Sequence, residues 1–81
     1  MRFEIILAPE AVRDLKKLKA NLRTDVRDAI ERYLRIRPTK TSKARIKRLR
    51  GVLRPQFRLR VHSVRVFYDV VETEVHILAI V

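Results

Sequence analysis

Apolar and polar residues alternate along the last third of the chain, and this pattern predicts three β-strands. The runs cover residues 56–62, 64–71 and 74–81 and are rich in Val, Ile, Leu, Phe and Tyr, the residue types that strands favour. A further apolar run at residues 2–8 predicts a fourth strand at the start of the chain. The gaps between the last three runs are so short that these strands should pair as antiparallel hairpins.

The region after the first predicted strand has helical periodicity. Pro9 suits the first position of a helix, and the next apolar residues form one narrow stripe: Val12, Leu15 and Leu18. Beyond Asn21, which is expected to cap a second helix, apolar residues recur at the spacing of a wide buried face: Leu22, Val26, Ala29, Ile30, Tyr33 and Leu34. Pro38 ends this pattern, and the short link between the two stripes implies a helical hairpin.

The predicted order of elements is βααβββ. This is an α+β fold with a small, mostly antiparallel sheet and the helical hairpin packed on one face. A chain of 81 residues is too short for two hydrophobic cores, so residues 1–81 are expected to form one domain. Strand alternation predicts which residues the helices cover: Phe57, Leu59, Val61, Val66, Tyr68 and Ile77.

The charge of the chain predicts a polyanionic partner. Twenty Lys and Arg residues against nine Asp and Glu leave a net charge of +11. Nucleic acid comes first, because phosphates favour many basic contacts. An acidic protein is an alternative, and an anionic membrane surface is a weaker one because the chain has no tryptophan. The chain has no cysteine and two histidines, so we expect no disulfide, metal or cofactor. No apolar run reaches membrane-spanning length, and a cytoplasmic protein is expected.

Cations dominate the segment before the second predicted strand. Residues 37–50 hold seven Lys and Arg residues and no acid, which is typical of a binding loop or of a solvated arm. The cations of this region that are expected to bind RNA or phosphate are Arg45, Lys47, Arg48, Arg50 and Arg54.

The face of the sheet away from the helices is predicted to be cationic. A two-residue turn at residues 62–63 places Arg60 opposite Arg65 and Arg58 opposite Phe67. Two arginines facing each other cost about 0.2–1 kcal/mol unless an anion lies between them, and arginine clamps phosphate with two donors. The arginines therefore either form a phosphate site or solvate the sheet. His62, beside them, is either a proton donor and acceptor or an exposed turn residue.

The same face is predicted to continue as an apolar patch. A two-residue turn at residues 72–73 places Leu78 opposite Phe67 and Ile80 opposite Arg65. A monomer rarely leaves such a patch bare, so Phe67, Leu78 and Ile80 are expected to stack on bases or to contact a partner protein. The same register places Asp69 opposite His76 as a charge pair.

Three short motifs occur in a fixed order after the first strand and the two helices. They are Leu-x-Gly at residues 49–51, aromatic-Arg-x-Arg-Val at 57–61 and Arg-Val-x-Tyr at 65–68. With this order and spacing, nearly the whole chain resembles the RelE/ParE superfamily of toxins from type II toxin–antitoxin systems. The resemblance implies a RelE-like fold, a cognate antitoxin as partner and a toxin–antitoxin hetero-oligomer.

The favoured branch, RelE, cuts messenger RNA on the ribosome without a metal and thereby inhibits translation. The resemblance carries its catalytic cations onto Arg58, Arg60 and Arg65, and His62 is the nearest candidate for proton transfer. The ParE branch, which inhibits DNA gyrase, is the alternative. Many members have a glycine at the turn where this chain has His62 and Ser63, and they continue beyond the last strand into further catalytic residues. This chain ends at Val81, so a shortened, non-catalytic homologue that keeps antitoxin binding is a third possibility.

Binding of nucleic acid should depend steeply on salt. We expect about four to six cations to touch phosphates, with a slope of log affinity against log salt near −0.7 per contact on single strands. Replacing Lys47 or Arg48 should weaken binding and reduce the slope by about one contact. A flat salt response in a binding titration would exclude nucleic acid as the direct partner.

Overall fold

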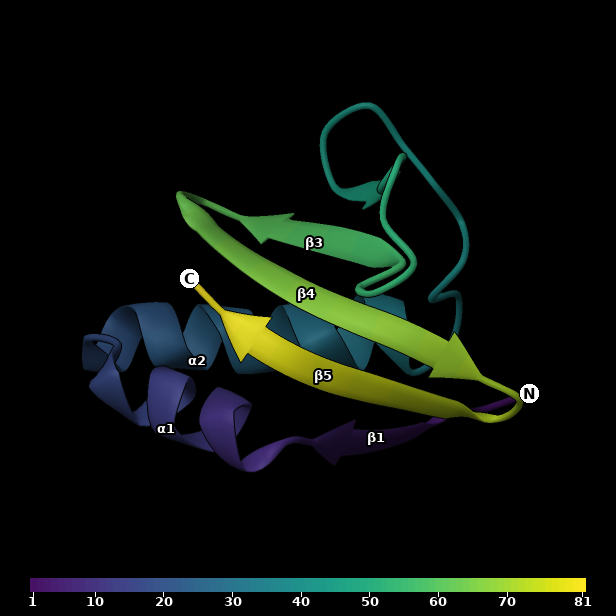
Figure 1. Cartoon of the computed structure of the whole chain (residues 1–81). Coiled ribbons are helices and arrows are strands. Elements are labelled where there is room, and N and C mark those ends of the chain that lie inside the picture. The colour runs from purple at the N-terminus through teal and green to yellow at the C-terminus, as the bar shows by residue number, and fades with distance from the viewer.

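The computed structural model describes residues 1–81 and has the predicted α+β architecture (Figure 1). Its elements are β1 (Glu4–Leu7), α1 (Pro9–Lys17), α2 (Ala20–Ala29), the π-helical turn η1 (Ile30–Leu34), β2 (Ile46–Arg48), β3 (Phe57–Val61), β4 (Val64–Val71) and β5 (Glu74–Ile80). No helix is long and apolar enough to cross a membrane.

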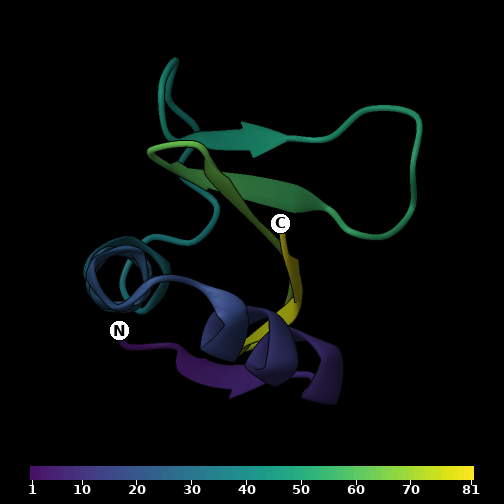
Figure 2. The same ribbon diagram turned by 90° about the vertical axis from the view of Figure 1, so that its left-hand side faces the viewer.

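The five strands form one sheet in the order β1-β5-β4-β3-β2. β1 runs parallel to β5, and the other neighbours are antiparallel. Figures 1 and 2 show the helices together on one side of this sheet, with the opposite side free of helices. We call the side under the helices the inner face and the other side the outer face.

The hydrophobic core lies between the helices and the inner face. All residues predicted for this face are buried: Phe57, Leu59, Val61, Val66, Tyr68 and Ile77. From the helices, Ala11, Leu15, Val26 and Leu34 complete the core. Val12 is 37% exposed, so the stripe of α1 that faces the sheet is centred on Ala11 and Leu15.

The second helix departs from the prediction at both ends. It begins at Ala20, with Lys19 at the N-cap position and no side-chain cap, so the predicted capping role of Asn21 is wrong. At its far end the backbone widens into η1, where the Arg35 amide donates to the Ile30 carbonyl five residues earlier, at 3.3 Å. Arg35 also connects this end to the residue before β1, because the Phe3 amide donates to the Arg35 carbonyl at 2.7 Å.

The β3–β4 hairpin has the predicted register, with Arg60 opposite Arg65 and Arg58 opposite Phe67. The β4–β5 hairpin follows its predicted register only as far as the pair of Tyr68 and Ile77. A bulge between Phe67 and Tyr68 then shifts the pairing by one residue. Phe67 consequently pairs with Ala79, so the predicted pairing of Leu78 with Phe67 is wrong. Ile80 pairs with Val66 and lies in the core at 4% exposure, so its predicted place on the outer face is also wrong.

The strand β2 lies within the cationic segment and was not predicted. Its one buried residue, Ile46, pairs with Leu59 of β3, and Lys47 pairs with Arg58. Two serine contacts fix its start, because the Ser42 hydroxyl accepts the amides of Arg45 at 3.0 Å and Ile46 at 3.4 Å. The segment is therefore partly an edge strand rather than only a loop or arm.

The turn between β4 and β5 holds a strained residue. Glu72 has a φ of +55°, a region in which the Cβ of an L-residue costs about 1–2 kcal/mol. Glu72→Gly should raise the free energy of unfolding by about 0.5–1 kcal/mol, since glycine removes this strain but gains entropy when unfolded. Urea denaturation measures the change. Thr73→Gly, at a neighbour with no positive φ, should instead destabilise, and equal effects of the two variants would contradict the argument.

Candidate functional site

The outer face carries a cluster of cations over β2, β3 and β4. Arg60 and Arg65 lie directly opposite each other, and the next row contains Lys47, Arg58 and Phe67 on three adjacent strands. Arg60 and Arg65 are exposed. Arg58 is half-buried, and its Nε atom is buried without a hydrogen-bond acceptor. We call Lys47, Arg58, Arg60, Arg65 and Phe67 the outer cationic cluster.

The one acid of β4 does not neutralise this cluster. Asp69 is 3% exposed; it accepts Arg54 Nε and the Gln56 amide, both at 2.7 Å. The side chain of Gln56 in turn binds β4, because its Oε1 atom accepts the Val70 amide at 2.9 Å. These contacts extend the β3–β4 pairing past its last strand residues and fix the end of the preceding loop. Arg54, predicted to bind phosphate, is therefore already paired with a carboxylate.

Asp69 and His76 are register partners, as predicted, but they do not form a charge pair. The His76 ring nitrogen Nε2 lies 2.8 Å from Glu74 Oε1, its neighbour on the same strand. The predicted charge pair is wrong because the Asp69 carboxylate binds the loop residue Arg54 instead.

The other cations of the basic segment, residues 37–50, lie on different surfaces. The Arg45 guanidinium lies 4.5 Å from the ring centre of Tyr33, and that of Arg48 lies 5.2 Å from the ring centre of Phe57. Phe57 belongs to the inner face, so Arg48 covers the edge of the core. Lys47 belongs to the outer cationic cluster, whereas Arg50 is exposed in the loop after β2. The segment thus places its cations on both sides of the sheet edge.

His62, at the tip of the β3–β4 hairpin, is turned toward the helices. Its Nε2 atom lies 2.8 Å from Asp25 Oδ2 on α2, and its backbone carbonyl accepts Arg60 Nε at 3.2 Å. Arg60, His62 and Asp25 line a cavity of about 450 Å³ together with Arg32 and Arg45. The carboxylate orients the imidazole and leaves its Nδ1 atom unpaired.

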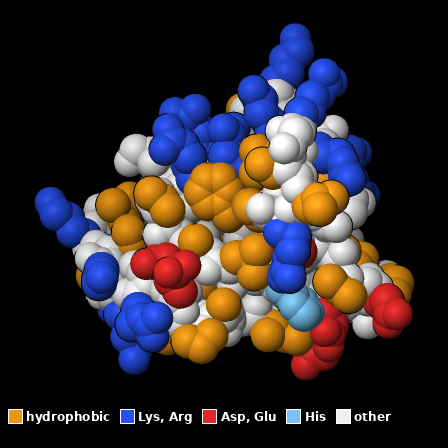
Figure 3. Space-filling view, in the orientation of Figure 1, with side chains coloured by type: hydrophobic (Ala, Val, Ile, Leu, Met, Phe, Trp, Pro, Cys, Tyr) orange, Lys and Arg blue, Asp and Glu red, His pale blue; other side chains and the backbone are white.

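The apolar part of the outer face contains two of the three predicted residues. Phe67 and Leu78 are half-buried there, whereas Ile80 is in the core. Figure 3 shows hydrophobic side chains across the middle of the outer face and Lys and Arg gathered above them. The face is therefore half apolar and half cationic, as predicted.

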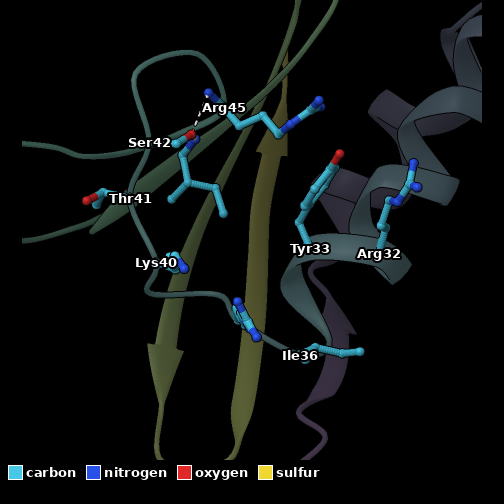
Figure 4. A pocket seen from close by; sticks show the side chains of 9 residues that line it. Arg32, Tyr33, Ile36, Lys40, Thr41, Ser42 and Arg45 are labelled. Atoms are coloured by element: carbon cyan, nitrogen blue, oxygen red, sulfur yellow. Dashed lines mark hydrogen bonds between the residues drawn. The ribbon is translucent and has the colours of Figure 1, made fainter.

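A second cavity, of about 390 Å³, was not predicted from the sequence. It lies between η1 and the segment that leads to β2, and Arg32, Tyr33, Arg37, Lys40 and Arg45 contribute to its lining (Figure 4). Tyr33, whose spacing predicts a place on the buried face of the helix, is half-buried against the core and also lines this cavity. Only the cation-rich segment that follows gave a signal for this cavity, and nothing in the sequence placed that segment against Tyr33.

The model of the family described as the ParE toxin of the type II toxin–antitoxin system parDE matches residues 5–81. The chain therefore belongs to this family, within the RelE/ParE superfamily of type II toxins. Comparison with curated protein sequences gave no match.

Solved structures with this fold include toxins from bacteria and archaea. The RelBE2 toxin–antitoxin complex of Mycobacterium tuberculosis contains a chain that matches with a TM-score of 0.81 and 25% identity, over 99% of this chain and 96% of that chain. The RelB–RelE complex of Methanococcus jannaschii gives a TM-score of 0.73 at 21% identity, over 94% and 87% of the two chains. The intact RelBE complex of E. coli gives 0.67 at 18% identity, over 96% and 93%.

Asp69→Ala should lower the free energy of unfolding by about 2 kcal/mol, because the Gln56 amide loses its charged acceptor. Arg54→Ala should cost less than about 1 kcal/mol, since the Arg54 side chain is 67% exposed and the ion pair is therefore weak. Urea denaturation of both variants tests this order. A larger loss for Arg54→Ala would mean that the ion pair, and not the backbone contact, holds the loop.

Proposed function

We propose that this toxin is a ribosome-dependent endoribonuclease that inhibits translation by cutting messenger RNA, with the outer cationic cluster as its active site. The observation that carries the proposal is the exposed pair of Arg60 and Arg65 beside the row of Arg58 and Phe67. Like charges directly opposite each other weaken a sheet, and a phosphate between them would relieve the repulsion. The neighbouring Phe67 ring offers a surface on which a base can stack.

The chemistry would be an attack of an RNA 2′-hydroxyl on the adjacent phosphate. The bond from the 2′-oxygen to phosphorus forms while the bond from phosphorus to the 5′-oxygen breaks, which leaves a cyclic phosphate and a 5′-hydroxyl. Negative charge develops on the phosphorane oxygens, where fixed guanidinium donors stabilise the transition state. Arg65 and Arg60 would supply these donors, and Arg58 lies in the next row of the same face.

A proton must leave the 2′-hydroxyl and another must reach the 5′-oxygen. Arginine remains protonated and is a poor base, so we assign proton transfer to His62. Asp25 holds its Nε2 atom at 2.8 Å, and Arg60 is bonded to its backbone carbonyl. When the imidazole donates from Nε2 to Asp25, its Nδ1 atom is free to accept a proton.

Inhibition of DNA gyrase is the second candidate function. It is favoured by the family whose model matches residues 5–81, which is described as the ParE toxin of parDE. Gyrase inhibition requires a binding surface rather than a transesterification site, and it makes no demand on the pair of Arg60 and Arg65 as donors to phosphorus.

A cognate antitoxin is the expected protein partner in either case. The similar toxins of M. tuberculosis, M. jannaschii and E. coli were solved as complexes with antitoxins. The apolar half of the outer face, with Phe67 and Leu78, offers such a partner a surface to bury. An antitoxin seated there would also cover the outer cationic cluster and so inactivate it.

Replacing Arg65 tests the proposed activity. Arg65→Ala should lower the rate of RNA cleavage by about 10²–10³, because one transition-state donor is lost. Its melting temperature should hold or rise slightly, since repulsion with Arg60 disappears. Cleavage of messenger RNA is measured on purified ribosomes, and growth and transcript cuts are followed after induction in cells.

Arg13→Ala removes an arginine that is also exposed, from α1 and away from the cluster, and should leave cleavage unchanged. If Arg65→Ala stays fully toxic, the assignment of the outer cationic cluster is wrong. DNA breaks with intact transcripts on induction of the unaltered chain would identify gyrase as the target instead.

A further inference from the structure

The cavity between η1 and the segment before β2 is lined by cations and by the aromatic ring of Tyr33. Four cations line it: Arg32, Arg37, Lys40 and Arg45. Tyr33, Ile36 and Ile46 supply its apolar surface, and Thr41 and Ser42 add hydroxyl groups. Its volume of about 390 Å³ lies within the range of small-ligand sites.

None of the four cations has an acidic partner. The ion pairs of the structure involve Arg35, Arg54, His62 and His76, and none involves a cation of this cavity. Arg45 donates no side-chain hydrogen bond, yet its guanidinium is held 4.5 Å from the Tyr33 ring centre. Arg32 lies at 6.0 Å, near the outer limit for such a contact. One guanidinium is therefore fixed with its donors unused, and a second lies loosely beside it.

We propose that this cavity binds one nucleotide of a single-stranded RNA, with a phosphate on Arg45 and its neighbouring cations and the base against Tyr33. A phosphate uses the fork of donors that a guanidinium presents. A base uses the flat aromatic surface in the same cavity. A carboxylate-rich peptide would pair with the cations, but its carboxylates would make no stacking contact with the Tyr33 ring.

The position of the cavity connects it to the outer cationic cluster. Arg32 and Arg45 line both this cavity and the neighbouring one, which also contains Arg60 and His62 together with Asp25 and Asp28. Arg60 in turn faces Arg65. Arg60, Arg45 and Arg32 thus connect the two sites around the end of β3, from the proposed cleavage site to Tyr33. The inference therefore rests on the proposed function and adds a site for a flanking nucleotide of the same RNA.

The test measures binding without cleavage. The full-length chain is titrated into a labelled single-stranded RNA hexamer that carries 2′-O-methyl groups throughout and so lacks the attacking hydroxyl. Tyr33→Leu keeps apolar bulk but removes the ring, and it should weaken binding by roughly 5-fold to 100-fold, the range for one base stacked on an aromatic residue. Tyr33→Phe keeps the ring and should bind within about 2-fold of the unaltered chain. Arg13→Gln is the charge control on α1.

Intrinsic fluorescence gives a second readout. The chain has two tyrosines and no tryptophan, and Tyr68 is fully buried. RNA should therefore quench the emission of Tyr33, and Tyr33→Leu should abolish that quenching. Polyglutamate, the acidic-peptide probe, should not quench it.

Three results would overturn the inference. They are an unchanged affinity of a folded Tyr33→Leu variant, an absence of quenching by the RNA, and an equal response to polyglutamate, which would assign the cavity to an acidic protein segment. Because the probe is not cleavable, these results leave the cleavage assay of the outer cationic cluster unaffected. Loss of cleavage activity would likewise leave the binding result unaffected.

Discussion

The structure depends on one buried tyrosine in the middle of the sheet. Tyr68 is fully buried on β4, stacks on Phe57 with ring centres 5.4 Å apart, and donates its hydroxyl to the Pro38 carbonyl at 2.6 Å. Burial raises the pKa of Tyr68, so the hydroxyl stays protonated and keeps donating. A buried hydroxyl without a partner would cost about 1–3 kcal/mol. This bond therefore fixes the segment around Pro38 against the core, and the cations that follow take their positions from it.

Side chains alternate between the two faces of the sheet along β3 and β4, so the same two strands contribute both to the core and to the outer cationic cluster. Leu59 and Val66 face the helices and hold the fold together, whereas Arg60 and Arg65 face away and repel each other. The repulsion is small beside the burial of the apolar set, which stabilises by about 1.5–3 kcal/mol per large side chain. The core can therefore support a pair of surface arginines that is locally unfavourable.

The sequence predicted the parts of the fold that follow from periodicity. The order of helices and strands follows from the change between helical and strand periodicity, and the buried set and the pairing of Arg60 with Arg65 follow from strand alternation around a two-residue turn. The bulge beside Phe67 has no such signature, and it moved Ile80 from the outer face to the core. β2 was missed because it has one buried residue, Ile46, among exposed cations. The contacts of Asp69 and Tyr33 join residues far apart in the chain, which periodicity does not address.

The basic segment uses its cations in two different ways. Arg45 and Arg48 are each held against an aromatic ring and have lost part of their freedom before any ligand arrives, whereas Arg54 is paired with the Asp69 carboxylate. Lys40 and Lys47 are exposed and without acidic partners, and as flexible point charges they attract a polyanion over a distance. Fixed guanidiniums suit a ligand with regularly spaced phosphates, whereas a diffuse cationic arm would accept any acidic surface. Under the proposed function, the held guanidinium of Arg45 would bind a phosphate of the RNA, and the free lysines would attract the RNA from a distance.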